Sequence, residues 1–460
     1  MPFASSQQKT SDLEALLLGG CELLKAWLTQ AAEGSPLPPL SILPQIEPQQ
    51  TGMDSESLLA DLRVVMEGAY NPSHPGALAH LDPPPLTASI VAELICAGLN
   101  NNLLAEELSP SLSHLERNFC QWFAQQLGLP LGSGGVAASG GSLSNLMALV
   151  TARNQCGLQG CTKAVVICSA DAHVSLGKAM AVMGLPQEGL VQVSVDSEGR
   201  INLHLLEEIL LSLYQKSIPV IAVVATAGTT VRGVVDPLLP MAKLCHRYGH
   251  WLHVDGAIGA VFGLCSAQQH RVHGLGLADS LTVNPQKLLG ITKTSSLLLL
   301  AEPEHLRNTF STGLPYMEAS WGGFHGGEAG LQGSRTGEIL KLWLGLRQLG
   351  LDGVEALVEA AIQRRRLLHA LLAEDDRLLI QGGDLHLLAF RPKCADAAAA
   401  EHWSIRTRQK LLCEHFMLSR PRYQAHHHLK AVLGNPYTQS HHLELLAKLI
   451  HCSLDSLPHA

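Results

Sequence analysis

Lys287 is the residue of this chain whose setting most directly suggests chemistry. It follows an Asn-Pro break in the stretch VNPQKLLGITKTSSLLLL, residues 283–300, where charged residues are few. Burial disfavours a charged amine, so a lysine in apolar surroundings loses part of its preference for the protonated form. Such an amine can act as a nucleophile that forms a Schiff base with a carbonyl compound. A lysine that buries its stem and keeps its ammonium group in water fits the same stretch.

Asp255 and His173 are polar residues beside predicted buried strands. Asp255 lies at the end of the apolar run in WLHVDGA, residues 251–257, and His173 follows AVVICSA, residues 164–170. A buried carboxylate is uncommon unless it is paired. Asp255 could therefore keep a ring nitrogen protonated, or serve as a helix cap or in a structural ion pair. His173 could stack on an aromatic ring, or be a structural histidine.

The segment ASGGSLSNLMALVTARN, residues 138–154, predicts a helix that begins at about Gly141-Ser142. Its apolar residues recur at positions i, i+3, i+4 and i+7, which is typical of one face of a helix. Glycines before a helix start let backbone N–H groups approach an anion, and the helix dipole favours phosphate there. An ordinary glycine-rich turn with a serine N-cap fits the same residues. The preceding GSGGVA is not a dinucleotide fingerprint, because no clear strand precedes it.

These four features together describe one ligand. A phosphate would lie at the helix start, and an aromatic ring would stack on His173 with its nitrogen on Asp255 and its aldehyde on Lys287. That ligand is pyridoxal 5′-phosphate, in which the cofactor accepts electrons and the protein supplies orientation and electrostatics.

The elements that position these residues are strands alternating with helices. Five β-rich runs are predicted as strands, at residues 164–170, 190–196, 220–226, 251–257 and 280–284. Residues 201–216 and 236–249 lie between them and are predicted as helices. This pattern indicates an α/β fold with a mostly parallel sheet that is covered on both faces. Ligands of such sheets bind at the carboxyl ends of the strands.

The pattern changes at both ends of the chain, which predicts three parts. Residues 1–65 contain an amphipathic helix at 11–32 and then a proline-rich connection, and form an N-terminal helical segment. Residues 66–335 are the large cofactor-binding domain. Residues 336–460 begin with long helices, at 338–350 and 353–374, and form a smaller C-terminal α+β domain.

Composition restricts the class of protein. The 460 residues exceed one compact core, and 46% hydrophobic against 16% charged residues suits a large interior or an oligomer interface. A formal net charge of −8 without a long basic run argues against nucleic acid as the main partner. The start of the chain is not a convincing signal peptide, and no apolar run approaches bilayer length. With 11 scattered cysteines, we expect a soluble cytoplasmic protein without a membrane partner.

From about residue 70 onward the chain resembles the group II pyridoxal-phosphate-dependent amino-acid decarboxylases, which include the glutamate, aromatic-amino-acid and diaminobutyrate enzymes. The matching motifs are HPGALAHL, SGGSLSNLMAL, DAHVSLGKA, VVATAGTTVRGVVDPL, HVDGAIGA, NPQK and LKAVLGNPYTQ. The resemblance implies the aspartate-aminotransferase-like fold (fold type I), with a seven-stranded, mostly parallel sheet. It also implies a homodimer with active sites at the interface and an L-amino acid as substrate.

The same resemblance assigns roles to individual residues. Lys287 would form the Schiff base, His173 would stack on the ring, and Asp255 would pair with the ring nitrogen. The remaining cofactor contacts that it implies are those of Gly141, Ser142, Thr226, Ala257, Asn284 and Gln286.

Three departures from the family pattern bear on catalysis and substrate. Gln286 replaces the histidine that usually precedes the lysine; it can donate a hydrogen bond to phosphate but cannot act as an acid or base. In the glycine-rich stretch 311–338, which suits a mobile lid, the expected proton-donating tyrosine is replaced by glycine, and His325 is the nearest donor. The segment AHLDPPP places His80 and Asp82 at substrate-contact positions, in a pattern closer to the diaminobutyrate enzymes, and Asp82 could favour a basic side chain.

The predicted function is decarboxylation of an L-amino acid to the amine and carbon dioxide. One alternative is decarboxylation with oxygen to an aldehyde, because the lid tyrosine is missing. Another is a pyridoxal-phosphate-binding protein without catalysis. The histidines at 426–428 and 441–442 are interpreted as a solvated surface cluster, and no metal site is predicted.

Overall fold

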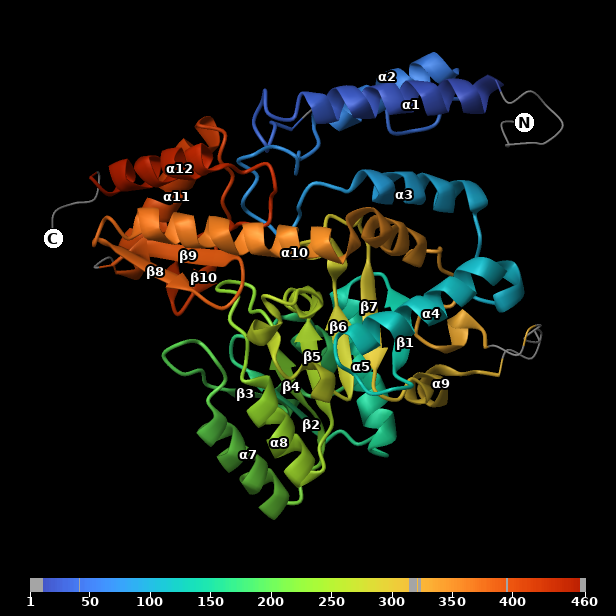
Figure 1. The fold of residues 1–460 in the computed structure, drawn as a ribbon, viewed down its shortest axis with the longest axis vertical. Coiled ribbons are helices and arrows are strands. Elements are labelled where there is room, and N and C mark those ends of the chain that lie inside the picture. The colour runs from blue at the N-terminus through green and yellow to red at the C-terminus, as the bar shows by residue number, and fades with distance from the viewer. Residues whose placement is uncertain (1–10, 41, 314–320, 322–323, 394–395, 456–460) are drawn as a thin grey trace.

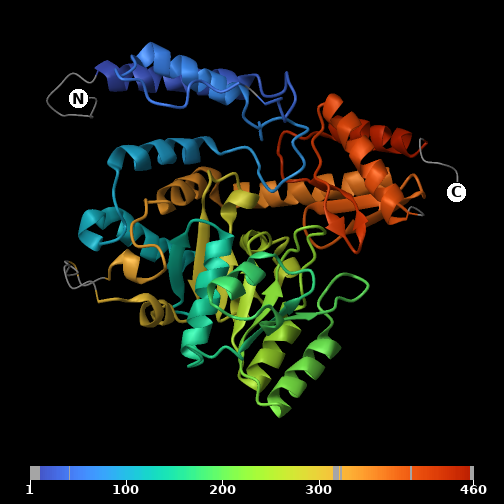
Figure 2. The ribbon, with the colours of Figure 1, turned by 180° about the vertical axis from the view of Figure 1, so that it is seen from behind.

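The structure is a computed structural model, and it describes residues 11–455 except 41, 314–320, 322–323 and 394–395. Figure 1 shows a central sheet flanked by helices, and a smaller C-terminal domain beside it. Two N-terminal helices lie side by side outside the rest of the chain, and the view from behind in Figure 2 shows the same arrangement.

A seven-stranded sheet forms the centre of the large domain, in the order β1-β7-β6-β5-β4-β2-β3. Its strands are β1 (Gly134–Ala138), β2 (Val165–Ser169), β3 (Leu190–Val193), β4 (Val220–Thr226), β5 (Leu252–Gly256), β6 (Ser280–Val283) and β7 (Ser296–Leu300). Strands β3, β2, β4, β5 and β6 pair in parallel, whereas β7 is antiparallel to both β6 and β1. The predicted mostly parallel sheet, and the five strands predicted within it, are confirmed.

Strands β1 and β7 were not among the five strands predicted from apolar runs. Strand β1 is the segment GGVAA, and its register pairs Val136 with Leu298 of β7. The GSGGVA segment is therefore part of the sheet's edge strand. Glycine and alanine have low strand propensity, so β1 depends on its pairing with β7 more than on its own sequence.

Helices cover both faces of this sheet. They are α4 (Pro110–Gln126), α5 (Gly141–Gln155), α6 (Ser175–Val182), α7 (Leu203–Gln215), α8 (Leu238–Tyr248) and α9 (Glu304–Phe310), whereas α3 (Thr87–Leu99) packs against α10 (Ile339–Leu372). Short 3-10 helices connect them, namely η1 (Glu106–Leu108), η2 (Gln187–Gly189), η3 (Ala260–Leu264), η4 (Gln269–Val272), η5 (Leu275–Leu277), η6 (Pro285–Lys287) and η7 (Gly326–Glu328). The predicted helix start at Gly141-Ser142 and the helices predicted at 201–216 and 236–249 are confirmed by α5, α7 and α8.

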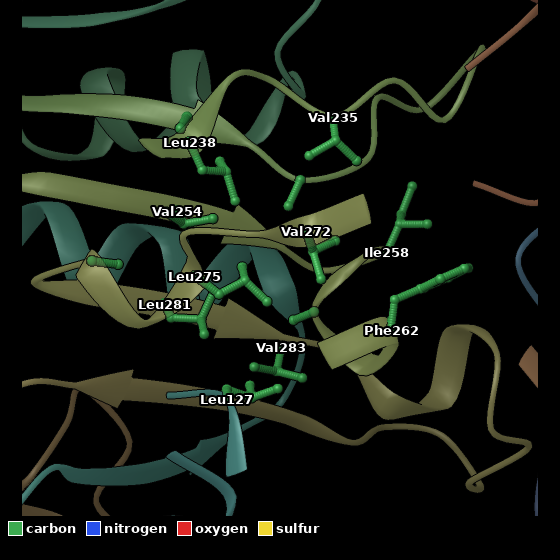
Figure 3. Packing of buried hydrophobic residues seen from close by; sticks show 14 of the residues in the cluster. Leu127, Val235, Leu238, Val254, Ile258, Phe262, Val272, Leu275, Leu281 and Val283 are labelled. Carbon is green, nitrogen blue, oxygen red and sulfur yellow. The ribbon is translucent and has the colours of Figure 1, made fainter. Parts of the chain in front are cut away.

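The core lies on both faces of the sheet. Along β4, Val223 and Ala225 belong to a cluster shared with α7 and α8, whereas Ala222 and Val224 belong to a cluster shared with α5 and α6. Figure 3 shows Val254 and Leu281 from the strands packing against Leu275 in the first cluster. Because every residue of β4 is buried, this strand has no polar alternation, as expected for a parallel sheet covered on both sides.

The C-terminal domain is built around a three-stranded antiparallel sheet, in the order β12-β9-β8. Its elements are α10 (Ile339–Leu372), β8 (Leu378–Gly382), β9 (Leu387–Pro392), α11 (Ala397–Cys413), β10 (Arg422–Tyr423), β11 (His426–His427), β12 (Leu429–Val432) and α12 (Ser440–Leu454). The two long helices predicted here form one element, α10, which is interrupted at Gly350, whose φ of 64° lies in the left-handed region that glycine tolerates.

The N-terminal segment contains α1 (Ser11–Thr29), which corresponds to the helix predicted at 11–32, and α2 (Ser55–Glu67). The side chain of Asp54 caps α2 by accepting a hydrogen bond from the Ser57 N–H group at 2.8 Å. None of the helices in the described ranges has the length and apolar character needed to cross a bilayer. The division into 1–65, 66–335 and 336–460 stays a prediction.

Candidate active site

A cavity of about 210 Å³ opens where β4, β5 and β6 end at their carboxyl edges, beside the N-terminus of α5. Eight of the residues predicted to contact the cofactor line this cavity: Gly141, Ser142, His173, Thr226, Asp255, Ala257, Asn284 and Lys287. They come from five separate stretches of the chain, so the fold brings together what the sequence holds up to about 150 positions apart. This is the edge at which parallel sheets bind ligands.

Lys287 is the last residue of η6, just after β6. Burial lowers the pKa of its amine below the ordinary value for lysine, while the negative charges of Asp255 and Asp82 act in the opposite direction. A lowered pKa increases the share of the neutral amine, which is the nucleophilic form. The setting that made Lys287 conspicuous in the sequence is therefore present in the structure.

Asp255 occupies the end of β5, 6% exposed, with its carboxylate held by two donors. Oδ1 accepts a hydrogen bond from the Ala257 N–H group at 3.2 Å, and Oδ2 accepts one from Asn145 Nδ2 at 2.9 Å. Hydrogen bonds to a carboxylate favour its ionised form. Each oxygen keeps a further acceptor position, so the group can still receive a proton donor from the cavity.

His173 is held by Ser175, the first residue of α6. The Ser175 N–H group donates to His173 Nδ1 at 3.2 Å, and Ser175 Oγ lies 2.9 Å from the same nitrogen. Burial lowers the pKa of His173, with Asp255 acting in the opposite direction. Because Nδ1 receives the backbone donor, the neutral ring carries its proton on Nε2. A neutral, fixed imidazole is suited to stacking.

The start of α5 is formed by glycines for steric reasons. A Cβ on Gly141 would lie 3.0 Å from Asn284 Nδ2 and 3.1 Å from Oδ1. With the amide oriented to satisfy both of its ends, Asn284 accepts from the Gly141 N–H group at 3.2 Å and donates to Ser296 Oγ at 2.7 Å. Asn284 thus fixes the helix start and also lines the cavity, and its predicted contact with the cofactor stays a prediction. Ser142 lines the cavity at this helix start, where the helix dipole favours an anion.

Thr226 gives an independent test of whether these residues fit the cofactor. It is 3% exposed at the end of β4 and lines the cavity, yet its hydroxyl has no hydrogen-bond partner within the part of the chain that the structure describes. Buried hydroxyls without partners are costly, and native proteins rarely keep them. A polar ligand in the cavity would satisfy Thr226. The donor set therefore fits a phosphorylated ring compound with an aldehyde.

Four other predicted site residues do not line this cavity. The oxygen of the Gln286 amide accepts a hydrogen bond from the Ser295 N–H group. His80 is exposed, and Asp82 forms an ion pair of 2.5 Å with Lys293, so Asp82 is not a free carboxylate. His325, 7% exposed, accepts a hydrogen bond from the Glu106 N–H group at 3.2 Å. The predicted lid containing it is only partly described, because 314–320 and 322–323 lie outside the described residues.

No role was predicted from the sequence for Asn145, which lines the cavity, or for Lys430, which is not part of the lining but bonds a residue of it. Asn145 lines the cavity in the middle of the second turn of α5 and contacts Asp255. Lys430 of β12 is 6% exposed and donates to the carbonyl oxygen of Thr230, which also lines the cavity, at 3.3 Å. Burial and then the charge of Lys287 lower the pKa of Lys430 to about 8. Nothing in the local sequence marks either residue, because α5 holds several other polar side chains and Lys430 belongs to a short strand.

The histidines at 426–428 are not a solvated cluster, which corrects that interpretation. His428 is 1% exposed, and burial lowers its pKa to about 4, while His426 and His427 are half-buried in the β10–β11 hairpin. In the ranges that the structure describes, no group of three or more histidine, cysteine or acidic side chains is placed to hold a metal ion.

The comparison with known proteins agrees with this site. The pyridoxal-dependent decarboxylase conserved domain matches residues 39–393. The chain is 27% identical over 391 residues to an L-2,4-diaminobutyrate decarboxylase of Acinetobacter baumannii, covering 79% of this chain and 76% of the relative. It is 30% identical over 360 residues to one of Rhizobium meliloti, covering 76% and 72%. A crystal structure of Oryza sativa TDC with PLP and tryptamine has a TM-score of 0.91 at 19% identity, over 99% of this chain and 100% of the other.

The chain belongs to the pyridoxal-dependent decarboxylase family. Its fold is the fold type I architecture of that family, with the smaller domain at the C-terminus. It is accordingly a carboxy-lyase that uses pyridoxal phosphate to decarboxylate an amino acid.

Proposed function

We propose that the cavity at the end of β4, β5 and β6 is the place where an L-amino acid loses its α-carboxyl group and leaves as the amine. The observation that carries this proposal is the meeting of Lys287, whose pKa is lowered by burial, with the buried Asp255 carboxylate in one cavity at the start of α5. Lysine and aspartate in these settings suit a carbonyl group and a protonated ring nitrogen of the same ligand.

Four groups of this chain would hold pyridoxal phosphate. Lys287 would bind its aldehyde carbon, Asp255 its ring nitrogen, and His173 one face of its ring. Ser142, which lines the cavity at the N-terminus of α5, would bind its phosphate. When bound, the cofactor supplies an electron-accepting ring that stabilises the charge left when carbon dioxide departs.

The protein's own part is to orient the substrate and to move one proton. Lys430 Nζ is a buried amine beside the cavity, and its charge acts on Lys287. The hydrogen bond described for Nζ goes to the Thr230 carbonyl oxygen, and an ammonium group has further donors for a carboxylate. We assign it the attraction of the substrate α-carboxylate. The proton that replaces carbon dioxide would come from Lys287 Nζ, which substrate binding frees, or from His325 Nε2. His325 can act only if the lid, in this chain or in a second copy, brings it to the cavity.

The first substrate to test is L-2,4-diaminobutyrate. The AHLDPPP segment and the two decarboxylase relatives support it. The pairing of Asp82 with Lys293 at 2.5 Å means that Asp82 is not a free carboxylate for a basic side chain, whereas Lys430 is a buried amine beside the cavity; acidic amino acids are therefore the competing class.

We propose further that the protein is a cytoplasmic homodimer. Apolar side chains are exposed on two neighbouring N-terminal elements: Leu13, Leu17 and Leu18 of α1, and Val91, Leu94, Ile95 and Leu99 of α3. Figures 1 and 2 both show α1 and α2 outside α3, with the body of the chain on one side only. A second copy would cover these faces. The ten described cysteines are free thiols, which suits a reducing compartment. Light scattering on the purified protein tests the mass.

A panel assay tests the proposed reaction. Purified protein with pyridoxal phosphate is incubated with each L-amino acid, including 2,4-diaminobutyrate, and carbon dioxide and organic product are both measured by mass spectrometry. We expect equal amounts of carbon dioxide and amine from one substrate, and none from Lys287→Ala. Release of carbon dioxide with an aldehyde instead, or full activity of Lys287→Ala, would overturn the proposal.

A further inference from the structure

We propose that Asn145 is a positioning residue that fixes the Asp255 carboxylate and the His173 ring in one arrangement, and that the buried imidazole of His253 sets the orientation of the Asn145 amide. This inference rests on the proposed pairing of Asp255 with the cofactor's ring nitrogen. Asn145 and His253 would thereby act on the cofactor through Asp255 and His173, without supplying the carboxylate, the amine or the stacked ring themselves.

Asn145 joins the two groups that would contact the cofactor ring. It is 1% exposed, and its Nδ2 donates to Asp255 Oδ2 at 2.9 Å and to Ser175 Oγ at 3.0 Å. Ser175 Oγ in turn lies 2.9 Å from His173 Nδ1. Both hydrogens of the amide are therefore used, one toward the carboxylate and one toward the support of the histidine. Through this amide, a shift of Asp255 would be coupled to His173.

The orientation of this amide is fixed from behind the site. Its Oδ1 lies 3.1 Å from His253 Nε2, and His253 Nδ1 lies 2.9 Å from Ser280 Oγ. Ser280 Oγ accepts a hydrogen bond from Trp251 Nε1 at 2.8 Å. An indole N–H can only donate, so the Ser280 hydroxyl keeps its own hydrogen for another acceptor, and His253 Nδ1 lies within its reach; the Ser280 carbonyl oxygen lies 3.2 Å from the same nitrogen.

His253 is neutral in this setting, and the tautomer that carries its proton on Nε2 is the one that matches the Asn145 amide. It is 0% exposed, and burial lowers its pKa to about 4, with Asp255 acting in the opposite direction. A neutral imidazole that accepts at Nδ1 must donate from Nε2, which points a hydrogen at Asn145 Oδ1. Every donor from Trp251 to Asn145 therefore points the same way, and the last one points at Asp255.

The reversed amide would fail at its contacts with Asp255 and with the His253 N–H group. Turned by half a rotation, Asn145 would place its oxygen against Asp255 Oδ2 and Ser175 Oγ, and its NH2 group against the His253 N–H group. A buried carboxylate without its donor loses part of the stabilisation of its charged form. The ring nitrogen of the cofactor depends on that charge to stay protonated, so the direction of the amide bears on the chemistry as well as on the fold.

Three variants and one control test this inference in the holoenzyme. Asn145→Asp keeps the size of the side chain but presents an acceptor to Asp255, and His253→Phe keeps a flat ring but removes the donor to Asn145. Ser280→Ala removes one hydroxyl, after which His253 can donate from Nδ1 to the Ser280 carbonyl oxygen at 3.2 Å and lose its Nε2 proton. Asn154→Ala, at the far end of α5, removes an asparagine that bonds only α9 and nearby loop groups.

The readouts are the dissociation constant of pyridoxal phosphate and the ¹⁵N chemical shift of its ring nitrogen, measured with labelled cofactor. We expect the three variants to bind the cofactor roughly 10- to 100-fold more weakly, with the nitrogen resonance moved toward its unprotonated position. Asn154→Ala should match the wild type in both. Circular dichroism of each variant checks its fold.

A wild-type nitrogen shift and affinity within about twofold in the folded variants would overturn the inference. Ser280→Ala, the smallest change, decides the matter if the other two do not fold. An Asp255→Asn variant separates the two levels of the argument. If it leaves the nitrogen shift unchanged, the proposed role of Asp255 fails and not only the role of the residues behind it.

Discussion

Replacing Thr226 by valine should stabilise the protein without cofactor and weaken its hold on the cofactor. The Thr226 hydroxyl is buried at the cavity and lacks a partner in the described chain. Such a hydroxyl costs about 1–3 kcal/mol, and valine replaces it with a methyl group of similar shape. At roughly 2.1 cal/mol/K of unfolding entropy per residue, the 460 residues convert each kcal/mol into a rise of about 1 °C in Tm.

The same change should reduce the affinity for pyridoxal phosphate by about three- to tenfold, because one neutral hydrogen bond to the ligand is lost. Thr282 is a matched control. Thr226 and Thr282 are the two register partners of Asp255 on the neighbouring strands, and the Thr282 hydroxyl is also buried without a partner among the described residues, but Thr282 does not line the cavity.

Calorimetry of both valine variants without cofactor, and titration with cofactor, checks the reasoning. We expect Thr282→Val to share the rise in Tm and to keep the wild-type affinity. The reasoning is refuted if Thr226→Val lowers the Tm of the cofactor-free protein, or if both variants lose affinity equally.

Three further changes have expected outcomes. Gly141→Ala should weaken cofactor binding about tenfold, because its Cβ would lie 3.0 Å from Asn284 Nδ2 and displace the start of α5; unchanged affinity by titration calorimetry would contradict this. Arg335→Met should lower the free energy of unfolding in urea by about 3–5 kcal/mol. The change leaves the buried Glu116 carboxylate without the two hydrogen bonds of 2.5 and 2.6 Å that Arg335 donates. A loss below about 1 kcal/mol would count against this prediction. Lys430 has a pKa of about 8 in the folded chain, against an ordinary value of 10.5. Between these two pH values the unfolded chain binds more protons than the folded chain, so the free energy of unfolding increases as the pH rises. Lys430→Met should remove up to about 1.4 kcal/mol per pH unit of that slope, and denaturant titrations with identical slopes for both proteins would refute the assignment.

The parallel centre of the sheet could be predicted from the sequence because its strands are buried on both faces. A run such as VIAVVAT must then be apolar throughout, and every residue of β4 is buried. The antiparallel edge could not be predicted in this way. The glycines and alanines of β1 favour no strand by themselves, and the leucines of β7 fit a buried helix as well as a strand. The pairing between them is a tertiary interaction.

Site residues could be predicted from the sequence where their own strand or helix places them at the cavity. Asp255 lies near the end of β5 and Lys287 follows β6, and the ends of these two strands meet at one edge of the sheet. Asn145 looked like an ordinary helix residue, because its value depends on Asp255 and His253 across the sheet. Lys430 of the C-terminal domain comes beside the cavity through its hydrogen bond to Thr230, which lines it. Side chains that act across domains leave no local pattern.

The most direct test of the account is to find the residue that binds the cofactor covalently. The protein is loaded with pyridoxal phosphate and reduced with borohydride, and its peptides are sequenced by mass spectrometry. The account predicts one modified residue, Lys287, with the absorbance of the bound cofactor lost in Lys287→Ala. Modification of Lys430, the other buried amine whose pKa is lowered at this site, or of several surface lysines with Lys287 intact, would contradict it.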